Sequence, residues 1–379
     1  AALAQFETCK QILKNELDVE PSVETTAFFE AIRAGDFSDE SFTSSLPELT
    51  PFFEPLSQEG PVFVGRENQL AQMEAHLEEA INGEGRVVLV SAEAGSGKTA
   101  LVSEFARRAL EKHPNLLAAS GRCNSFSGQG DAYLPLHQVM ETLCCIKNPE
   151  WPGAVERLWE AFPQTLSTVM TTGPDLIDRL INPVKVMSRA IAVEATTKIW
   201  LEPLQKLIQA ERENPKVRDT QFIIDMFNSV LAALSKHNPL LIVLDDLQWV
   251  DNASSDLLFD LIRKMSDSRI CMIGMYRPSE VFSKADGSNP FEPLIYEAKT
   301  HFGDTGIDLD SVSDSEARFF VDAFLDSEQN QFGDDFRSNL FAQTGGNPLF
   351  TTELLRTMQA QGDIRQLQDQ GWVAESFFP

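Results

Sequence analysis

The segment Ala92–Thr99 holds the residues most suited to chemistry, because it combines small residues with a lysine and a threonine. It follows the apolar, β-branched run Arg86–Val90, which predicts a buried strand. It precedes apolar residues at helical spacing, namely Leu101, Val102, Phe105 and Ala109. A strand, a glycine loop, Lys-Thr and a helix in this order predict a phosphate-binding loop. The alternative is a glycine turn that only joins a strand to a helix.

Each residue type in this loop has a part in binding a polyphosphate. Gly95 and Gly97 allow backbone N–H groups to turn inward around phosphate oxygens, and the following helix adds its partial positive charge. Lys98 can reach the β- and γ-phosphates, and the Thr99 hydroxyl can ligate Mg²⁺. Ala92 replaces the usual first glycine, which is acceptable if its φ angle is negative. The remaining candidates for nucleotide binding are Ala94, Ser96 and Ala100.

A second candidate segment is Leu240–Asp246, in which an apolar run ends in two carboxylates. Such a run is typical of a central parallel strand, and ligands bind at the carboxyl edge of such sheets. Asp245 would hold Mg²⁺, through water, and Asp246 would act as general base toward the attacking water. The alternative is a strand that merely ends in an acidic turn.

Length and composition limit the classes of protein to consider. The chain has 379 residues, too many for one ordinary domain, and a formal net charge of −26. Such a charge repels nucleic acid, so we expect any DNA contact to belong to domains outside this sequence. The five cysteines show no metal-ligand spacing and suggest reduced thiols in the cytoplasm. No apolar stretch is long enough for a membrane span, and the missing initiator Met suggests part of a longer protein.

The first 36 residues have the apolar pattern of two helices, AALAQFETCKQILKNELDVEPSVETTAFFEAIRAG. This segment resembles the end of the bacterial transcriptional activation domain, a tetratricopeptide-like module of SARP-type transcription regulators. The alternative is any amphipathic helical hairpin. Residues 37–60 are rich in Ser, Glu, Asp and Pro and are predicted to be a linker.

The sequences of three further segments resemble motifs of the STAND class of P-loop ATPases. These are FVGRE at 63–67, RPSE at 277–280 and GNP at 346–348. The resemblance implies that Val64 and Arg66 lie at the adenine, and that Pro348 touches the base from a helical lid. It also implies that Arg277, at the end of the predicted strand Arg269–Arg277, senses the γ-phosphate; the alternative is a surface arginine.

Together these features predict an α/β fold, a P-loop NTPase with a parallel central sheet flanked by helices. The expected parts are a helical tail at 1–36, the linker, an ATPase core with a helical insertion at 61–304, and a helical lid at 305–379 that ends in the start of another module. Within them, 281–304 is expected to be loop and Thr305–Val312 the last strand.

The expected ligands are ATP or ADP and Mg²⁺, and the catalytic candidates are Asp246, Lys98 and Arg277. The resemblance implies a slow ATPase switch of a cytoplasmic transcription regulator, closed with ADP and self-associating with ATP, whose inducer the sequence does not give. The alternatives are a non-hydrolysing nucleotide-bound scaffold and the ATPase module of a multidomain cyclase or kinase.

Overall fold

The computed structural model describes residues 64–124, 132–213, 219–282, 289–311, 313–367 and 371–374. The chain divides into two compact units, Ala1–Glu54 and Pro55–Pro379, and every described residue belongs to the second unit. The helical segment predicted at 1–36 and the linker predicted at 37–60 lie outside the described residues. The predicted domain boundaries therefore stay predictions.

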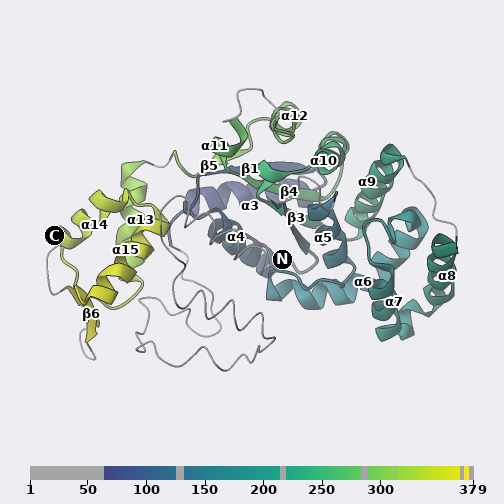
Figure 1. The fold of residues 1–379 in the computed structure, drawn as a ribbon, viewed down its shortest axis with the longest axis horizontal. Coiled ribbons are helices and arrows are strands. Elements are labelled where there is room, and N and C mark those ends of the chain that lie inside the picture. Colours follow the sequence, from purple (N-terminus) through teal and green to yellow (C-terminus); the bar gives the residue numbers. More distant parts are fainter. Residues whose placement is uncertain are drawn as a thin grey trace, which may run out of the picture. The chain divides into compact units, whose positions relative to one another are not determined.

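A parallel sheet of five strands forms the centre of the fold (Figure 1). The strand order is β2-β3-β4-β1-β5, and every pairing between neighbours is parallel. The strands are β1 (Arg86–Ser91), β2 (Leu117–Arg122), β3 (Leu240–Asp245), β4 (Ile270–Tyr276) and β5 (Gly306–Asp308). The predicted fold class is confirmed, although the last strand is shorter than the predicted Thr305–Val312.

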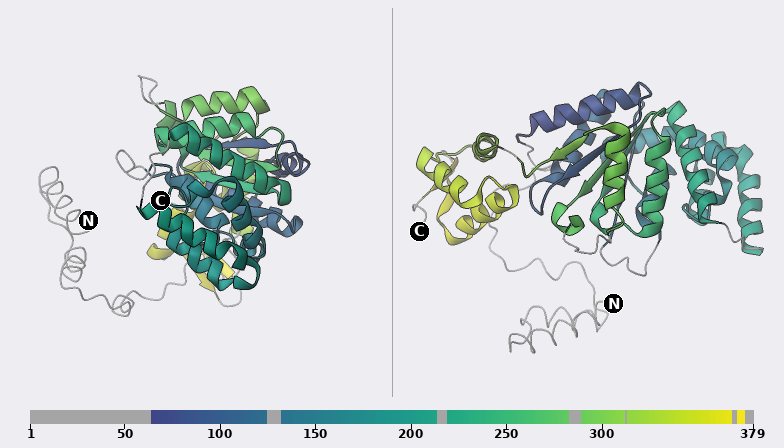
Figure 2. Two further views of the ribbon diagram at one scale, coloured as in Figure 1. Left: turned by 90° about the vertical axis from the view of Figure 1, so that its right-hand side faces the viewer. Right: turned by 90° about the horizontal axis from the view of Figure 1, so that it is seen from above.

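Helices cover both faces of this sheet (Figure 2). They include α3 (Glu67–Ile81), α4 (Lys98–Lys112), α5 (Leu134–Leu143), α9 (Thr220–His237), α10 (Asn252–Lys264) and α12 (Glu292–Phe302). The prediction of a loop over 281–304 was wrong, because α12 lies within it. Leu294, Ile295 and Ala298 are buried along one side of α12, which packs on α10 and β1. This short apolar stripe stabilises a helix in an otherwise polar segment.

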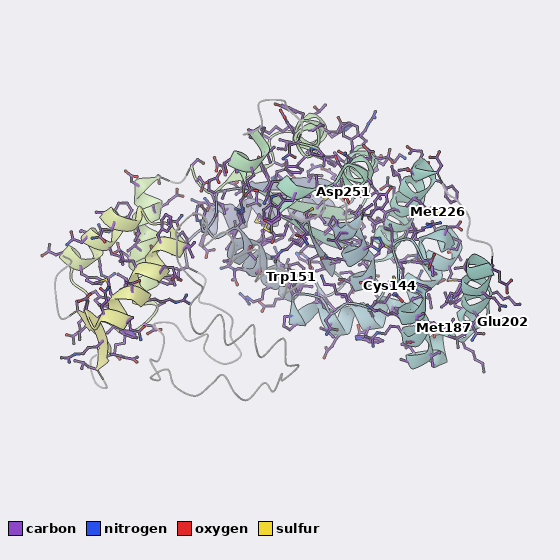
Figure 3. The ribbon with its side chains drawn as sticks, viewed as in Figure 1. Cys144, Trp151, Met187, Glu202, Met226 and Asp251 are labelled. Carbon is purple, nitrogen blue, oxygen red and sulfur yellow. The ribbon has the colours of Figure 1, made fainter. Side chains whose placement is uncertain are left out.

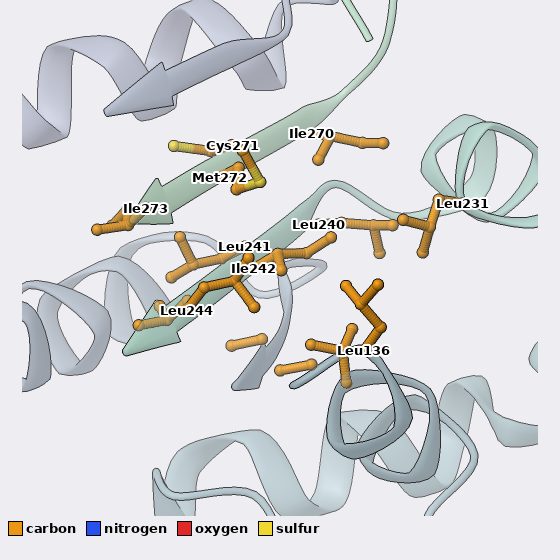
Figure 4. Packing of buried hydrophobic residues seen from close by; sticks show 14 of the residues in the cluster. Leu136, Leu231, Leu240, Leu241, Ile242, Leu244, Ile270, Cys271, Met272 and Ile273 are labelled. Carbon is orange, nitrogen blue, oxygen red and sulfur yellow. The ribbon is translucent and has the colours of Figure 1, made fainter. Parts of the chain in front are cut away.

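The core of the sheet is continuous and apolar, as expected of parallel strands covered on both faces. Every residue of β3 and β4 is buried. Figure 4 shows Leu240 of β3 beside Ile270 of β4, with Leu136 of α5 and Leu231 of α9 packed near Leu240. The sheet is therefore rigid where its strands end, and it can hold side chains at that edge in fixed positions.

A helical insertion lies between β2 and β3, as predicted. Its helices are α6 (Val155–Thr172), α7 (Pro183–Ala192) and α8 (Glu194–Glu213), with the short helices η1 (Pro152–Ala154) and η2 (Pro174–Leu176). Met187 and Glu202 lie on this insertion in Figure 3, apart from Asp251, which follows β3. The insertion therefore adds a separate helical layer and leaves the strand ends to the core.

The C-terminal part consists of α13 (Asp314–Asp326), α14 (Asp334–Thr344), α15 (Pro348–Gln361) and the hairpin β6 (Ile364–Leu367) and β7 (Gly371–Ala374). Ser313 and Glu316 form the predicted capping box at the start of α13. Asn347 caps α15 with Pro348 in its first turn, which confirms the predicted helix start. The hairpin was not predicted; Trp372 anchors it, buried against the loop after α13.

Two expectations about cysteines and membranes can be compared with the described residues. The four cysteines among them, Cys123, Cys144, Cys145 and Cys271, are free and buried. None of the helices in the described part combines the length and the hydropathy that crossing a membrane requires.

Candidate nucleotide-binding site

The predicted phosphate-binding loop joins the end of β1 to the start of α4. Gly95 and Gly97 have φ angles of 82° and 89°, a region that glycine enters without the cost a side chain would add. Gly97 is the N-cap of α4, so Lys98 and Thr99 form its first turn. Ala92 is buried and is not among the residues with positive φ. An alanine therefore fits the position usually held by glycine.

Lys98 bends back over the loop that precedes it. Its Nζ donates to the carbonyl oxygen of Ala92 and, at 3.0 Å, to that of Glu93. Burial lowers the pKa of this ammonium group, Arg277 lowers it further, and nearby carboxylates raise it, namely Asp310, Asp245 and Asp246. Lys98 and the two acids at the end of β3 thus interact electrostatically, and their assignment to a nucleotide site stays a prediction.

The two acids sit where β2 and β3 end side by side. Asp245 is buried, and its register partner in β2 is Arg122, which donates to Asp245 Oδ2 at 2.7 Å. This bond, ahead of the opposing effect of burial, raises the pKa of Arg122. Asp246 has a φ angle of 56°, which is uncommon for a residue with a side chain and is often found at functional sites.

Arg122 was not predicted as a site residue. The sequence does place an arginine at the end of a predicted strand. It does not show that this strand pairs with the strand that ends in Asp245, because that pairing depends on the tertiary structure. The ion pair partly neutralises the carboxylate proposed to hold Mg²⁺.

Arg277 follows β4, the strand between β1 and β3. Its Nη2 lies 3.8 Å from Asp246 Oδ1, and its Nη1 donates to Glu280 at 3.0 Å. The guanidinium carbon lies 5.4 Å from the centre of the Trp249 ring, a cation–π distance. Its Nε is buried and has no hydrogen-bond partner among the described residues. The structure therefore brings Arg277 beside the predicted base.

The loop also contacts the segment that leads into the lid and the lid itself. The Gly95 carbonyl oxygen accepts a hydrogen bond from the Leu349 N–H of α15 at 3.2 Å. Asp310 accepts from the Ser96 hydroxyl at 2.6 Å and from the Glu93 N–H at 2.7 Å. A change in the conformation of the loop would therefore alter its contacts with α15 and with the segment between β5 and α13.

Arg66 joins the start of the core to the same linker. It is the N-cap of α3 with a φ angle of 63°, and its Nη1 donates to the Leu309 carbonyl oxygen at 3.1 Å. Burial lowers the pKa of this guanidinium, while Glu316 and Asp310 raise it. Arg66 therefore lies between the segment that follows β5 and the first turn of α13, and its role at a nucleotide stays a prediction.

A cavity of about 780 Å³ lies beside the loop and along α4. This volume is within the range of pockets that bind small molecules and cofactors. Predicted site residues line it, namely Val64, Arg66, Ser96, Gly97, Thr99, Ala100 and Pro348. Trp151, labelled in Figure 3, lines it on the side of η1. A smaller cavity of about 460 Å³ shares Arg66, Ser96 and Pro348. Ala94 is exposed and lines neither cavity, and neither cavity is lined by Gly95, Lys98, Asp245, Asp246 or Arg277.

The Thr99 hydroxyl and the Asp245 carboxylate are too few to bind a metal ion by themselves, and this number of protein ligands is typical of Mg²⁺ bound together with a nucleotide. Within the described ranges, no group of three or more His, Cys, Asp or Glu side chains could hold a metal ion. Mg²⁺ keeps several waters and binds through one or two protein oxygens plus substrate phosphates. The Thr99 hydroxyl and the Asp245 carboxylate are donors of this kind, and the assignment of the metal to them stays a prediction.

The parallel sheet and the loop at the end of β1 define a P-loop NTPase fold. Residues 62–273 match the AAA ATPase domain family, which is more than half of the chain. The chain therefore belongs to this family.

Two similar proteins give further comparisons. "Uncharacterized protein R02095" of Rhizobium meliloti (strain 1021) is 23% identical over 295 residues, which are 78% of this chain and 25% of that protein. The chain thus spans about a quarter of the length of this relative. The Aeropyrum pernix ORC1 protein, solved in complex with DNA, has a TM-score of 0.42 at 14% identity and covers 81% of this chain and 63% of its own.

We predict that Lys98→Ala removes most of the affinity for ATP while the protein stays folded. A hydrogen bond to a charged group contributes about 1.5–3 kcal/mol, so a loss of at least about tenfold in Kd is expected. Isothermal titration calorimetry measures the affinity, and circular dichroism checks the fold. Lys112→Ala, at the other end of α4, is the control because Lys112 pairs with Glu78 on the surface. Equal ATP affinity of wild type and Lys98→Ala would refute the site.

Proposed function

We propose that this chain is an ATP-binding and ATP-hydrolysing switch in a multidomain bacterial transcription regulator. In this proposal the ADP-bound form is closed and the ATP-bound form is open. The observation that carries it is the hydrogen bond from Leu349 N–H to the Gly95 carbonyl oxygen. It connects a lid helix directly to the loop expected to hold the phosphates, so the number of phosphates can influence the lid.

The proposed hydrolysis follows from how the side chains are arranged. A water molecule attacks the γ-phosphorus, its proton passes to the Asp246 carboxylate, and the bond to the β–γ bridging oxygen breaks to give ADP and phosphate. Lys98 and the loop N–H groups would stabilise the charge on the phosphate oxygens, with Arg277 beside Asp246. Mg²⁺, bound through Thr99 and Asp245, would supply further charge neutralisation.

A nucleotide can shift the lid only if it interacts differently with the two forms. Two sets of contacts are candidates for this difference: the Gly95–Leu349 bond, and the bonds from Asp310 to Ser96 and Glu93. A γ-phosphate would crowd the loop and add negative charge near Asp310, which favours release of the lid. Pro348 lines the cavity at the start of α15, and it would connect the adenine base of the nucleotide to this lid helix.

The regulatory part of the proposal rests on the family resemblance of the sequence. The FVGRE, RPSE and GNP segments resemble STAND ATPases, and residues 1–36 resemble the end of the transcriptional activation domain. The chain spans about a quarter of the Rhizobium meliloti relative, which leaves room for further domains in such proteins. We propose a cytoplasmic protein that self-associates with ATP and contacts DNA only through domains outside this sequence.

A second candidate is a nucleotide-bound scaffold that does not hydrolyse ATP. The ion pair between Arg122 and Asp245 favours it, because a paired carboxylate is less available to Mg²⁺. The retained Asp246 beside Arg277 favours hydrolysis instead. An ATPase module of a multidomain cyclase or kinase would share the same site and differ only in its flanking domains.

We predict that Asp246→Asn slows steady-state phosphate release by about 10²- to 10⁴-fold, the range for loss of a general base, while ATP still binds. Asp251→Asn is a matched control, because Asp251 caps α10 and asparagine caps a helix equally well. Its phosphate release should stay within about threefold of wild type. If wild type and Asp246→Asn bind ATP and release phosphate equally slowly, the scaffold is the better account.

We predict that Asp310→Ala speeds the release of ADP. Loss of the bonds to Ser96 and Glu93 should loosen the segment between β5 and α13 that leads to the lid. If about 1–2 kcal/mol is lost, the dissociation rate of ADP should rise about five- to thirtyfold. Stopped-flow displacement of a fluorescent ADP measures this rate. Asp314→Ala, in the first turn of α13, controls for charge alone. Slower ADP release from Asp310→Ala would show that Asp310 repels the nucleotide and does not hold the closed form.

A further inference from the structure

Gln248 lies on a short helix, η3 (Leu247–Trp249), directly after the two acids of β3. Its side chain is buried, with 4% of the residue exposed. Nε2 donates to Asp246 Oδ1 at 2.9 Å, and Oε1 accepts from the Arg277 backbone N–H at 3.2 Å. One amide therefore joins the proposed base to the segment that carries the proposed γ-phosphate sensor.

These two bonds require an amide at this position. The Asp246 carboxylate needs a donor and the Arg277 N–H needs an acceptor, and a glutamine side chain offers both at once. A glutamate at neutral pH would offer only acceptors and would repel Asp246. A methionine of similar length would offer no comparable partner to either group.

The surroundings hold Gln248 in place. Its backbone carbonyl oxygen accepts from Asn289 Nδ2 at 3.1 Å, and Asn289 is itself buried. Asn289 Nδ2 also lies 3.4 Å from the Glu280 carbonyl oxygen, in the short helix α11 (Pro278–Phe282) that follows Arg277. The Gln248 side chain is buried and both of its polar atoms are hydrogen-bonded, so few other rotamers are available to it. It can therefore hold the Asp246 carboxylate in one orientation.

The segment after β4 is also tied to the phosphate-binding loop. The Glu93 carboxylate accepts from the Ser279 N–H at 2.9 Å and from the Ser279 hydroxyl at 2.6 Å. The loop, Arg277 and Asp246 thus belong to one hydrogen-bonded network, in which Gln248 makes the connection to the base. Loss of Gln248 would remove its hydrogen bond to Asp246 Oδ1 and leave the bonds of the loop to Ser279 in place.

We propose that Gln248 is a positioning residue for hydrolysis, which holds Asp246 Oδ1 so that Oδ2, 3.9 Å from Arg122 Nε, is oriented to take the proton of the attacking water. The proposal rests on the proposed ATP hydrolysis and adds to it the group that orients the base. The two side-chain hydrogen bonds of Gln248 go to Asp246 and to the Arg277 N–H, and neither group belongs to the phosphate-binding loop, so loss of Gln248 should lower the rate of hydrolysis and spare ATP binding.

The test measures single-turnover hydrolysis of ATP by excess full-length chain, together with the Kd for ATP. For Gln248→Met we expect the hydrolysis rate to fall about 10- to 100-fold, the range for partners that orient a reacting group. The Kd for ATP should stay within about threefold of wild type, because no nucleotide contact is lost. Thermal unfolding checks that the variant is folded.

Gln248→Glu supplies a readout that a purely structural role would not give. A protonated glutamic acid carries one donor and one acceptor, as the amide does. The charged groups around it are the acids Asp245, Asp246 and Glu280 and the cations Arg122, Arg277 and Lys98. The cations oppose protonation of the new acid, but the Asp246 carboxylate, which the new side chain contacts directly, favours it. The rate of ATP hydrolysis by Gln248→Glu, divided by the wild-type rate, should therefore rise as the pH falls from 8 to 6. An interval of about two pH units covers most of the titration of a single group. Gln248→Met should show no such rise.

Asn228→Leu is the matched control for loss of a buried amide. Asn228 is buried on α9, and its Nδ2 donates to the Asp260 carboxylate of α10 at 2.7 Å, in a pair that includes none of the site residues. This variant should unfold at a lower temperature than wild type, yet hydrolyse bound ATP at the wild-type rate. If it slows hydrolysis as much as Gln248→Met, the effect of Gln248 is structural and the inference is refuted.

The remaining outcomes separate this inference from the proposed function. If wild type hydrolyses ATP and Gln248→Met does so at the same rate, only the role of Gln248 is refuted. If wild type binds ATP but does not hydrolyse it, the proposed function fails and the role of Gln248 fails with it. A slow Gln248→Met with intact ATP affinity, and recovery of Gln248→Glu at low pH, would support the inference.

Discussion

The constraint on which this structure depends is electrostatic: the loop after β1 lies close to the two acids at the end of β3. Burial lowers the pKa of the Lys98 ammonium group in this loop and Arg277 lowers it further, while Asp310, Asp245 and Asp246 raise it. Arg122 pairs with Asp245, and Asp310 takes two donors of the loop. Opposite charges thus compensate one another locally, so neither the lysine nor the acids stand isolated in a partly buried site.

The parallel sheet makes this arrangement possible. Strands that run in one direction end at one edge, so the loop after β1, the acids after β3 and Arg277 after β4 meet there although they are far apart in sequence. Because β4 lies between β1 and β3, the arginine is placed between the loop and the acids. The linker after β5 completes the set with Asp310, and α15 reaches the loop through Leu349.

Features governed by local chemistry could be predicted from the sequence, and those governed by tertiary contacts could not. The loop at Ala92–Thr99, the acidic end of β3 and the cap at Asn347 depend on residues close in sequence, and the structure has each of them. The helix α12 was missed because its apolar stripe is short. The partners of Arg122 and Asp310 are far away in the sequence, and only the fold brings them near. Gln248 contacts Asp246 two residues before it, but its second partner, the Arg277 N–H, is brought near only by the sheet.

The most direct test of this account is a crystal structure of the chain with Mg²⁺ and a non-hydrolysable ATP analogue. The account predicts that Lys98 leaves the carbonyl oxygens of Ala92 and Glu93 for the phosphates, with the metal between Thr99 and Asp245. A polyphosphate bound away from the loop after β1, with Lys98 still donating to those carbonyl oxygens, would contradict it.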